Sequence, residues 1–176
     1  AGGITLGTSK NHPSSIACIG FNGFVRLVGV NGVTVALADC ISIYSISATA
    51  GTLNYCSYAT AASVIYTPNT PAALPILSGI TTFTGGAGSN TFTNTAGSNT
   101  WSISNNNAGS ISGKSFNAFG TLVGGNGDTF ALADGKSIDS ISATAGTLNY
   151  SAYTTDVSVN GETNTATKVG ILSGIT

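Results

Sequence analysis

The chain contains 176 residues, of which only 6% are charged, and its net charge is −1. Its five Lys and Arg residues are scattered along the sequence, which argues against nucleic acid as a partner because phosphates are neutralised by clustered cations. No apolar run approaches the ~20 residues that a membrane-spanning helix needs, so we expect no membrane insertion.

The composition is typical of an all-β protein. There are 24 Gly residues and no Met, and hydrophobic residues make up 41% of the chain. Ser, Thr and Asn supply most of the polarity in place of charged helix formers. The hydrophobic fraction is too high for a disordered chain.

The sequence repeats itself. Residues 21–81 (the first copy) align without a gap to residues 116–176 (the second copy), and 38 of the 61 positions are identical. We therefore predict two repeat units, 1–81 and 82–176, of which the first is incomplete at its start. Regular tandem units usually stack along one axis.

The predicted elements are short strands in which inward apolar residues alternate with outward Thr, Ser or Asn. In chain order through the second unit, the inward residues are Phe83, Phe92, Trp101 with Ile103, Phe130 with Leu132, Leu148 with Tyr150, and Val157 with Val159. Turns are predicted between them at Gly85-Gly86, Asn105 to Asn107, Gly124-Gly125, Asn126-Gly127 and Asp134-Gly135.

Two architectures fit this pattern. Inward residues that recur every nine or ten positions, on strands of three to five residues, favour a β-solenoid of the parallel β-helix or β-roll kind. Tandem Ig-like β-sandwiches of about 95 residues are the alternative, although a sandwich would want several strands of the usual 5–6 residues or longer.

One motif carries candidate metal chemistry. Residues 85–93 match the nonapeptide G-G-x-G-x-D-x-U-x, with Asn90 at the Asp position and Phe92 at the apolar position, and residues 124–130 give a shorter copy with Asp128. In such turns, carbonyl and carboxylate oxygens converge on calcium. Asp128 and Asn90 are therefore the candidate calcium ligands, and calcium is the one cofactor that we consider.

The motif resembles the RTX-like β-roll segments of giant secreted bacterial adhesins and related surface filament proteins. Residues 148–160 and 170–176 are similar to stretches that follow such turns in this family. The resemblance implies an extracellular or cell-surface location and a structural role. Asn90 stands where the family has Asp, and Val33 aligns with Asp128, so a metal-free turn whose Asn or Asp bonds the backbone is the competing interpretation.

Catalytic groups are sparse. The single His, His12, precedes a Pro near the start, and we expect it to be a solvated loop residue. A polysaccharide-active β-helix enzyme would need converging acidic groups in one groove, for example Asp128, Asp139 or Asp156 together with Lys136. We expect turn caps instead, and therefore no enzyme.

Cysteine and tyrosine have structural interpretations. Cys18, Cys40 and Cys56 all lie in the first unit, align with Gly or Ser in the second copy, and allow at most one internal disulfide. Tyr150 and Tyr153 are predicted to pack against the core rather than stack on sugars.

We therefore expect an extracellular structural or adhesive repeat protein that associates with itself, head to tail, as a surface filament or part of a long stalk. Surface glycans are a second partner class. A calcium-stabilised ligand-binding module is the alternative function.

Overall fold

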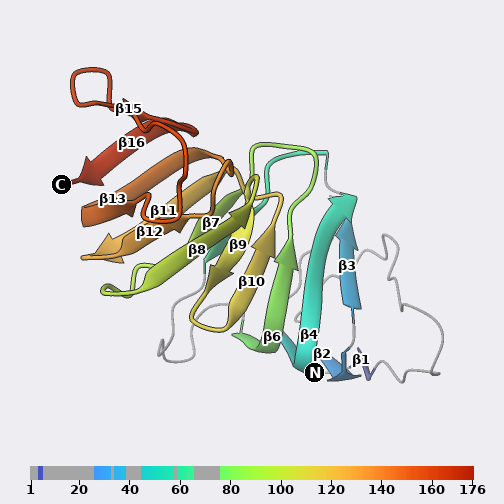
Figure 1. The fold of residues 1–176 in the computed structure, drawn as a ribbon. Coiled ribbons are helices and arrows are strands. Elements are labelled where there is room, and N and C mark those ends of the chain that lie inside the picture. Colours follow the sequence, from blue (N-terminus) through green and yellow to red (C-terminus); the bar gives the residue numbers. More distant parts are fainter. Residues whose placement is uncertain (1–3, 6–25, 33, 39–44, 58, 66–75) are drawn as a thin grey trace.

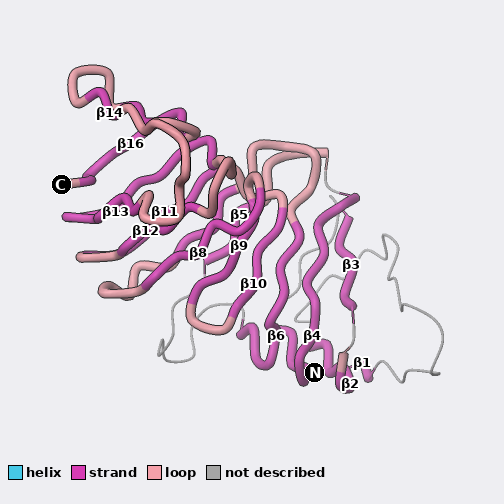
Figure 2. Tube along the Cα trace, in the orientation of Figure 1, coloured by secondary structure: helices cyan, strands magenta, loops and turns pink. Residues whose placement is uncertain are grey.

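The computed structural model describes residues 4–5, 26–32, 34–38, 45–57, 59–65 and 76–176. This part of the chain is all-β and contains no helix (Figures 1 and 2). Sixteen strands form one curled mixed sheet with the outline of a half-barrel. The strands are β1 (Ile4–Thr5), β2 (Arg26–Asn31), β3 (Thr34–Ala38), β4 (Ser45–Ser57), β5 (Ser63–Ile65), β6 (Ile76–Thr84), β7 (Thr91–Thr93), β8 (Thr100–Asn105), β9 (Ala108–Ile111), β10 (Lys114–Asn117), β11 (Thr121–Asn126), β12 (Thr129–Leu132), β13 (Ile138–Asn149), β14 (Val159–Asn160), β15 (Thr165–Ala166) and β16 (Val169–Ile175).

The sequence repeat is also a repeat of strand pairing. All four residue pairs between β2 and β4 recur between β11 and β13 with 95 added to each number. For example, Leu27 lies opposite Ile46 in the first copy, and Leu122 lies opposite Ile141 in the second. Three of the four pairs between β3 and β4 recur in the same way between β12 and β13, and four of the seven pairs between β4 and β6 recur between β13 and β16. Aligned residues of the two copies thus share the same pairing register wherever these pairs recur.

The two longest strands each change neighbours partway along. On one edge, β4 pairs with β2 before residue 50 and with β3 after it, and β13 pairs with β11 before residue 145 and with β12 after it. On the other edge, β4 pairs with β6 both before and after this point. Ala50 and Ala145 have φ values of 48° and 47° at these points, in the left-handed region that side chains disfavour. Gly146 follows, and a Cβ there would lie 2.9 Å from the side chain of Ile175. The bend therefore depends on a small residue.

A hairpin joins the strands of the two units. β9 lies antiparallel between β8 and β10, whereas β10 pairs parallel to β6 and β8 pairs parallel to β12. Gly109 of β9 lies opposite both Ile103 and Phe116. A Cβ on Gly109 would meet the Ser102 carbonyl oxygen at 1.9 Å, so only glycine fits between these strands.

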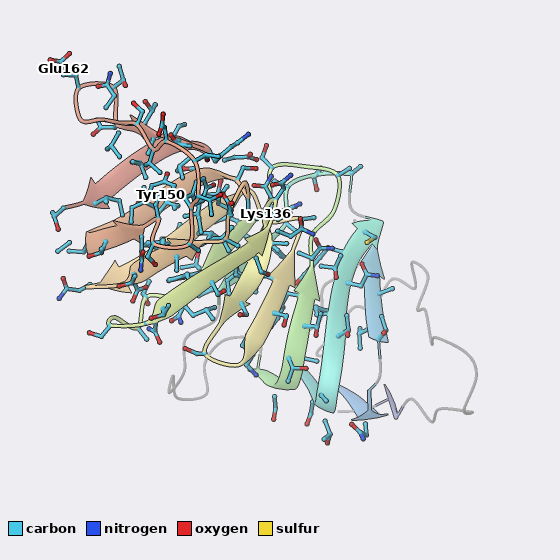
Figure 3. All side chains as sticks on the ribbon, viewed as in Figure 1. Lys136, Tyr150 and Glu162 are labelled. Atoms are coloured by element: carbon cyan, nitrogen blue, oxygen red, sulfur yellow. The ribbon has the colours of Figure 1, made fainter. Side chains whose placement is uncertain are left out.

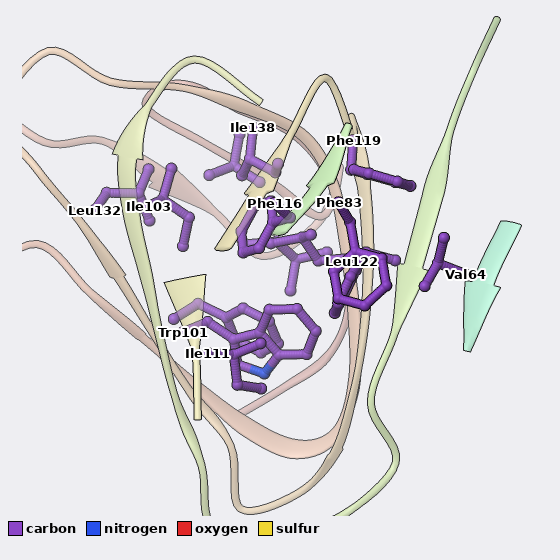
Figure 4. Close-up of a cluster of buried hydrophobic side chains, with 14 of the residues drawn as sticks. Val64, Phe83, Trp101, Ile103, Ile111, Phe116, Phe119, Leu122, Leu132 and Ile138 are labelled. Atoms are coloured by element: carbon purple, nitrogen blue, oxygen red, sulfur yellow. The ribbon is translucent and has the colours of Figure 1, made fainter. Parts of the chain in front are cut away.

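One apolar core runs through both units. The ring centroid of Phe92 lies 5.3 Å from that of Phe83 and 5.5 Å from those of both Phe116 and Phe119, while Trp101 stacks on Phe130. Phe83, Phe116 and Trp101 of this cluster are labelled in Figure 4. The inward prediction is confirmed at Phe83, Phe92, Trp101, Ile103, Phe130 and Leu132, which are all buried, while Leu148 and Tyr150 pack against the core half-buried. The cluster extends from Val35 to Leu172.

The inward prediction is wrong for Val157 and Val159. They are 39% and 63% exposed, because β14 pairs only with β15 and no described strand covers its apolar side.

A second correction concerns Gly124-Gly125, predicted as a turn. Both residues lie buried within β11, at the irregularity between Val123 and Asn126.

The strand direction turns steadily along the sheet, from β3 and β4 at one end to β13 and β16 at the other (Figure 1). This is the twist that side-chain sterics impose on neighbouring strands. The predicted boundary between residues 81 and 82 falls inside β6, which runs without interruption from Ile76 to Thr84. The division into two units stays a prediction about sequence, since β6 belongs to both.

Candidate functional site

The glycine-rich turn connects β6 to β7, and its candidate ligand Asn90 is buried. The Nδ2 group of Asn90 donates hydrogen bonds to the carbonyls of Gly86 and Ala118, each at 2.8 Å. Its Oδ1 accepts the backbone N–H of Ala62, also at 2.8 Å. Both amide donors and the acceptor are therefore paired within the protein, and the side chain ties together three segments that are far apart in the sequence.

Close backbone approach explains the glycines of this turn. A Cβ on Gly85 would lie 2.3 Å from the carbonyl oxygen of Ala118, and one on Gly88 would lie 2.6 Å from the nitrogen of Ala61. Side chains at either position would push these segments apart. The motif thus packs the second unit against residues 60–62 of the first.

Asp128, the other candidate ligand, is fully buried. Its Oδ1 accepts the backbone N–H of Asn99 at 2.8 Å, and its Oδ2 accepts the Gly125 N–H and the Trp101 Nε1–H, each at 2.8 Å. A Cβ on Gly124 would lie 2.7 Å from Oδ2. Three N–H donors therefore solvate the carboxylate, and it joins the start of β8 to the irregularity of β11.

The structure does not bring the two calcium candidates together. The partners of Asn90 and those of Asp128 share no residue. Among the described residues, no group of three or more His, Cys, Asp or Glu side chains could hold a metal ion. Calcium takes six to eight oxygen ligands, whereas these oxygens accept protein N–H groups. Calcium binding stays a prediction, and the contacts favour the metal-free interpretation of the turn.

Two of the other acidic residues, Asp139 and Asp134, bond to polar side chains at the surface. Asp139 Oδ2 accepts Asn107 Nδ2 at 2.9 Å, and Asp134 Oδ2 accepts the Thr154 hydroxyl at 2.5 Å. Glu162 lies at the tip of the loop between β14 and β15, away from Lys136 (Figure 3). The enzyme alternative asked for a surface groove that could include Asp128, but that side chain has no exposed surface.

Tyr150 and Tyr153 both pack against the core. Their two rings contact each other edge-to-face, with ring centroids 4.9 Å apart. The Tyr150 hydroxyl donates to the carbonyl of Thr167, and the Tyr153 hydroxyl donates to the carbonyl of Lys136. Burial, followed by the neighbouring Tyr153, raises the pKa of Tyr150 to about 12. Burial and then Asp134 raise the pKa of Tyr153. Both hydroxyl groups are hydrogen-bonded within the protein, and both rings pack against the core, as predicted from the sequence.

A row of hydroxyl groups crosses the outward face of the sheet. Its members lie opposite one another on six neighbouring strands, from β3 through β4, β6, β10 and β9 to β8. They are Thr34, Thr52, Thr82, Ser115, Ser110 and Ser102. In the sequence, Thr34, Thr52 and Thr82 lie far from Ser102, Ser110 and Ser115, and only the strand pairing brings these residues into one row.

Several predicted residues have no described surroundings. His12, Cys18 and Cys40 lie outside the described residues, so the disulfide prediction is untested, and Cys56 is an exposed free thiol. No helix in the described part of the chain has the length and apolar character to cross a membrane.

The two copies differ in exposure where the second copy ends. Val64 is 2% exposed, but its counterpart Val159 is 63% exposed. Leu53 is buried, whereas its counterpart Leu148 is only half-buried. Val64 and Val159 are the same residue type, as are Leu53 and Leu148. The difference in exposure therefore cannot be read from these residues themselves, and it arises from what covers each copy.

No family model, curated protein or solved structure matches this chain. The resemblance to RTX-like adhesin repeats stays a prediction. Function is therefore inferred from geometry.

Proposed function

We propose that this chain is a non-enzymatic, extracellular structural repeat protein, whose units stack on further copies to build a filament or stalk at the cell surface. The observation that carries the proposal is the pairing register, which recurs with 95 added to each residue number across one continuous core. A fold that already joins one copy to the next through backbone pairing has the means to join more.

The pairings support the β-solenoid interpretation over tandem sandwiches. Thr121 of β11 lies opposite Ser140 of β13, and Ser140 lies opposite Ile171 of β16, in both cases as parallel neighbours. Parallel neighbours 19 and 31 residues apart are what successive coils of a solenoid produce. Ig-like sandwiches consist of antiparallel sheets. Among the described residues, antiparallel pairing is confined to the strands β8–β9–β10 and to the strands β14–β15–β16.

Low charge suits this role. A net charge of −1 gives little repulsion between copies. The outward row of hydroxyl groups described above offers hydrogen-bonding groups to surface glycans, the second partner class. Extracellular location rests on the adhesin resemblance.

Electron microscopy of the concentrated full chain tests the proposal. In the strand order, six interstrand steps separate β4 from its counterpart β13, so at ~4.8 Å per step a unit adds at most about 29 Å to a stack. We expect filaments or short rods whose axial rise per unit does not exceed this length. A strictly monomeric protein at all concentrations, measured by sedimentation, would contradict self-association.

A further inference from the structure

Residues 82–93, which follow the first copy in the chain, cover its apolar end. Phe83 lies opposite Leu53 in a parallel pair, and Phe92 lies opposite Val64. The rings of Phe83 and Phe92 contact each other edge-on at 5.3 Å. Both Leu53 and Val64 are buried as a result.

Backbone and amide groups complete this internal interface. The N–H of Thr91 donates to the carbonyl of Ala62 at 2.9 Å, and the N–H of Ala62 donates to Asn90 Oδ1 at 2.8 Å. Gly88 packs against the backbone of Ala61. The segment 82–93 therefore combines two short strands with a buried polar clamp between them.

The second copy presents the same surface without this cover. Its residues 147–149 are identical to residues 52–54, and Ser158-Val159 is identical to Ser63-Val64. Within the described part of the chain, residues 147–149 pair with β12 alone, and Val159-Asn160 pairs with β15 alone. Val157, the counterpart of buried Ala62, is 39% exposed. Apolar side chains and unpaired strand edges thus coincide at this end.

We propose that this end of the second copy is an acceptor surface for one more 95-residue unit, which binds through its own segment equivalent to residues 82–93. By the register of the first copy, Phe83 of the incoming segment would lie opposite Leu148, and Phe92 opposite Val159. The inference specifies the contact behind the proposed self-association and rests on that function for its biological meaning. The occupant is another unit of this kind because residues 147–149 and 158–159 repeat the residues and spacing of 52–54 and 63–64, which pair with this segment within the chain. Asp156 and Val157 replace Ala61 and Ala62, so the clamp there would be made through the backbone N–H of Val157.

A synthetic peptide of residues 82–93 tests the contact on the full chain. We expect saturable one-to-one binding by calorimetry, together with new hydrogen-exchange protection at residues 147–149 and 158–160. Val159→Asp should weaken peptide binding at least tenfold, because it places a charge opposite Phe92. Ile171→Asp is the matched control: Ile171 is 62% exposed but lies outside the acceptor register, so binding should be unchanged.

A covalent version keeps the test decisive if a free peptide binds too weakly to measure. Residues 82–93 are appended directly after Thr176, which repeats the junction between Thr81 and Thr82 in the first copy. We expect a higher Tm than that of a chain whose appended segment carries Phe83→Ser and Phe92→Ser, and the gain should vanish with Val159→Asp. No gain in Tm, or a gain that Val159→Asp leaves intact, would overturn the inference.

These results separate the inference from the proposed function. Filaments that form equally well with Val159→Asp would remove the inference and leave self-association standing. Peptide binding at the acceptor surface by a chain that never assembles would support the contact and remove the filament.

Discussion

The indole Nε1–H of Trp101 donates a 2.8 Å hydrogen bond to Oδ2 of Asp128, and both side chains are fully buried. A buried carboxylate is costly unless its oxygens are paired. Here Gly125 and Asn99 supply the other donors. A residue that the sequence marks as a calcium candidate thus orients the largest side chain of the core.

Asp128→Asn is expected to lower the free energy of unfolding by about 1–3 kcal/mol, because an amide NH2 would replace one oxygen that now faces N–H donors. Urea unfolding followed by Trp101 fluorescence measures the loss. Asp156→Asn is the control, since Asp156 is exposed and its substitution should change stability by less than about 0.5 kcal/mol. Equal stability of the two variants would show that the buried hydrogen bonds contribute nothing.

Asn90→Asp restores the residue that RTX-like turns carry, yet it should destabilise the protein by more than about 2 kcal/mol. The new oxygen would face the carbonyls of Gly86 and Ala118, which now accept hydrogen bonds from Nδ2. Added calcium should not recover the lost Tm. In the control, Asn160→Asp, the acceptor oxygen that caps Glu162 and Thr163 is kept, and little change is expected. Recovery of Tm by calcium would instead favour a metal site in this turn.

The free energy of unfolding should decrease at alkaline pH because Tyr150 ionises more readily in the unfolded chain than in the folded protein. Its pKa is raised from 10.0 to about 12 in the folded protein, so the folded state favours the neutral phenol. The corresponding stabilisation is complete below pH 10 and is lost as pH rises from 10 through 12. Unfolding by urea at intervals across this range measures the slope. Tyr150→Phe should make the slope shallower; an unchanged slope would mean that other groups cause the alkaline loss.

Gly109→Ala should cost about 1–3 kcal/mol through overpacking. The added methyl group would meet the Ser102 carbonyl at 1.9 Å and the ring of Phe116 at 3.0 Å, and both belong to strands paired with β9. Gly161→Ala is the matched control, because a Cβ there meets nothing within 4 Å. Thermal unfolding distinguishes the two. A tolerated methyl at residue 109 would mean that β9 can shift between its neighbours.

Composition and alternation are sufficient to predict the all-β class and most inward residues, because each depends on the local preference of a strand for one buried face. Phe83, Trp101 and Phe130 follow this rule. The repeat of 95 residues correctly relates the pairing registers of the two copies. These are properties that each short segment carries in its own sequence.

What the sequence does not reveal depends on partners far along the chain. Val64 and Val159 follow the same residue, Ser, yet one is buried and the other is exposed, because only Val64 has Phe92 opposite it. The role of Asn90 as a clamp on Ala62 and Ala118 is equally remote from its local motif. Glycines at 85 and 88 indicate a calcium turn by pattern, whereas close backbone packing explains them in the fold.

The reversed direction of β9 bears on how the length of such a protein can change through gene duplication or deletion. β8 and β10 are both antiparallel to β9, so they run in the same direction as each other and as their parallel neighbours β12 and β6. Loss of β9 together with β10 would therefore leave β6 beside β8 with the same polarity, whereas a further reversed strand next to β6 or β12 would break their parallel pairing. Viable length variants should therefore keep or lose β9 and β10 as a pair.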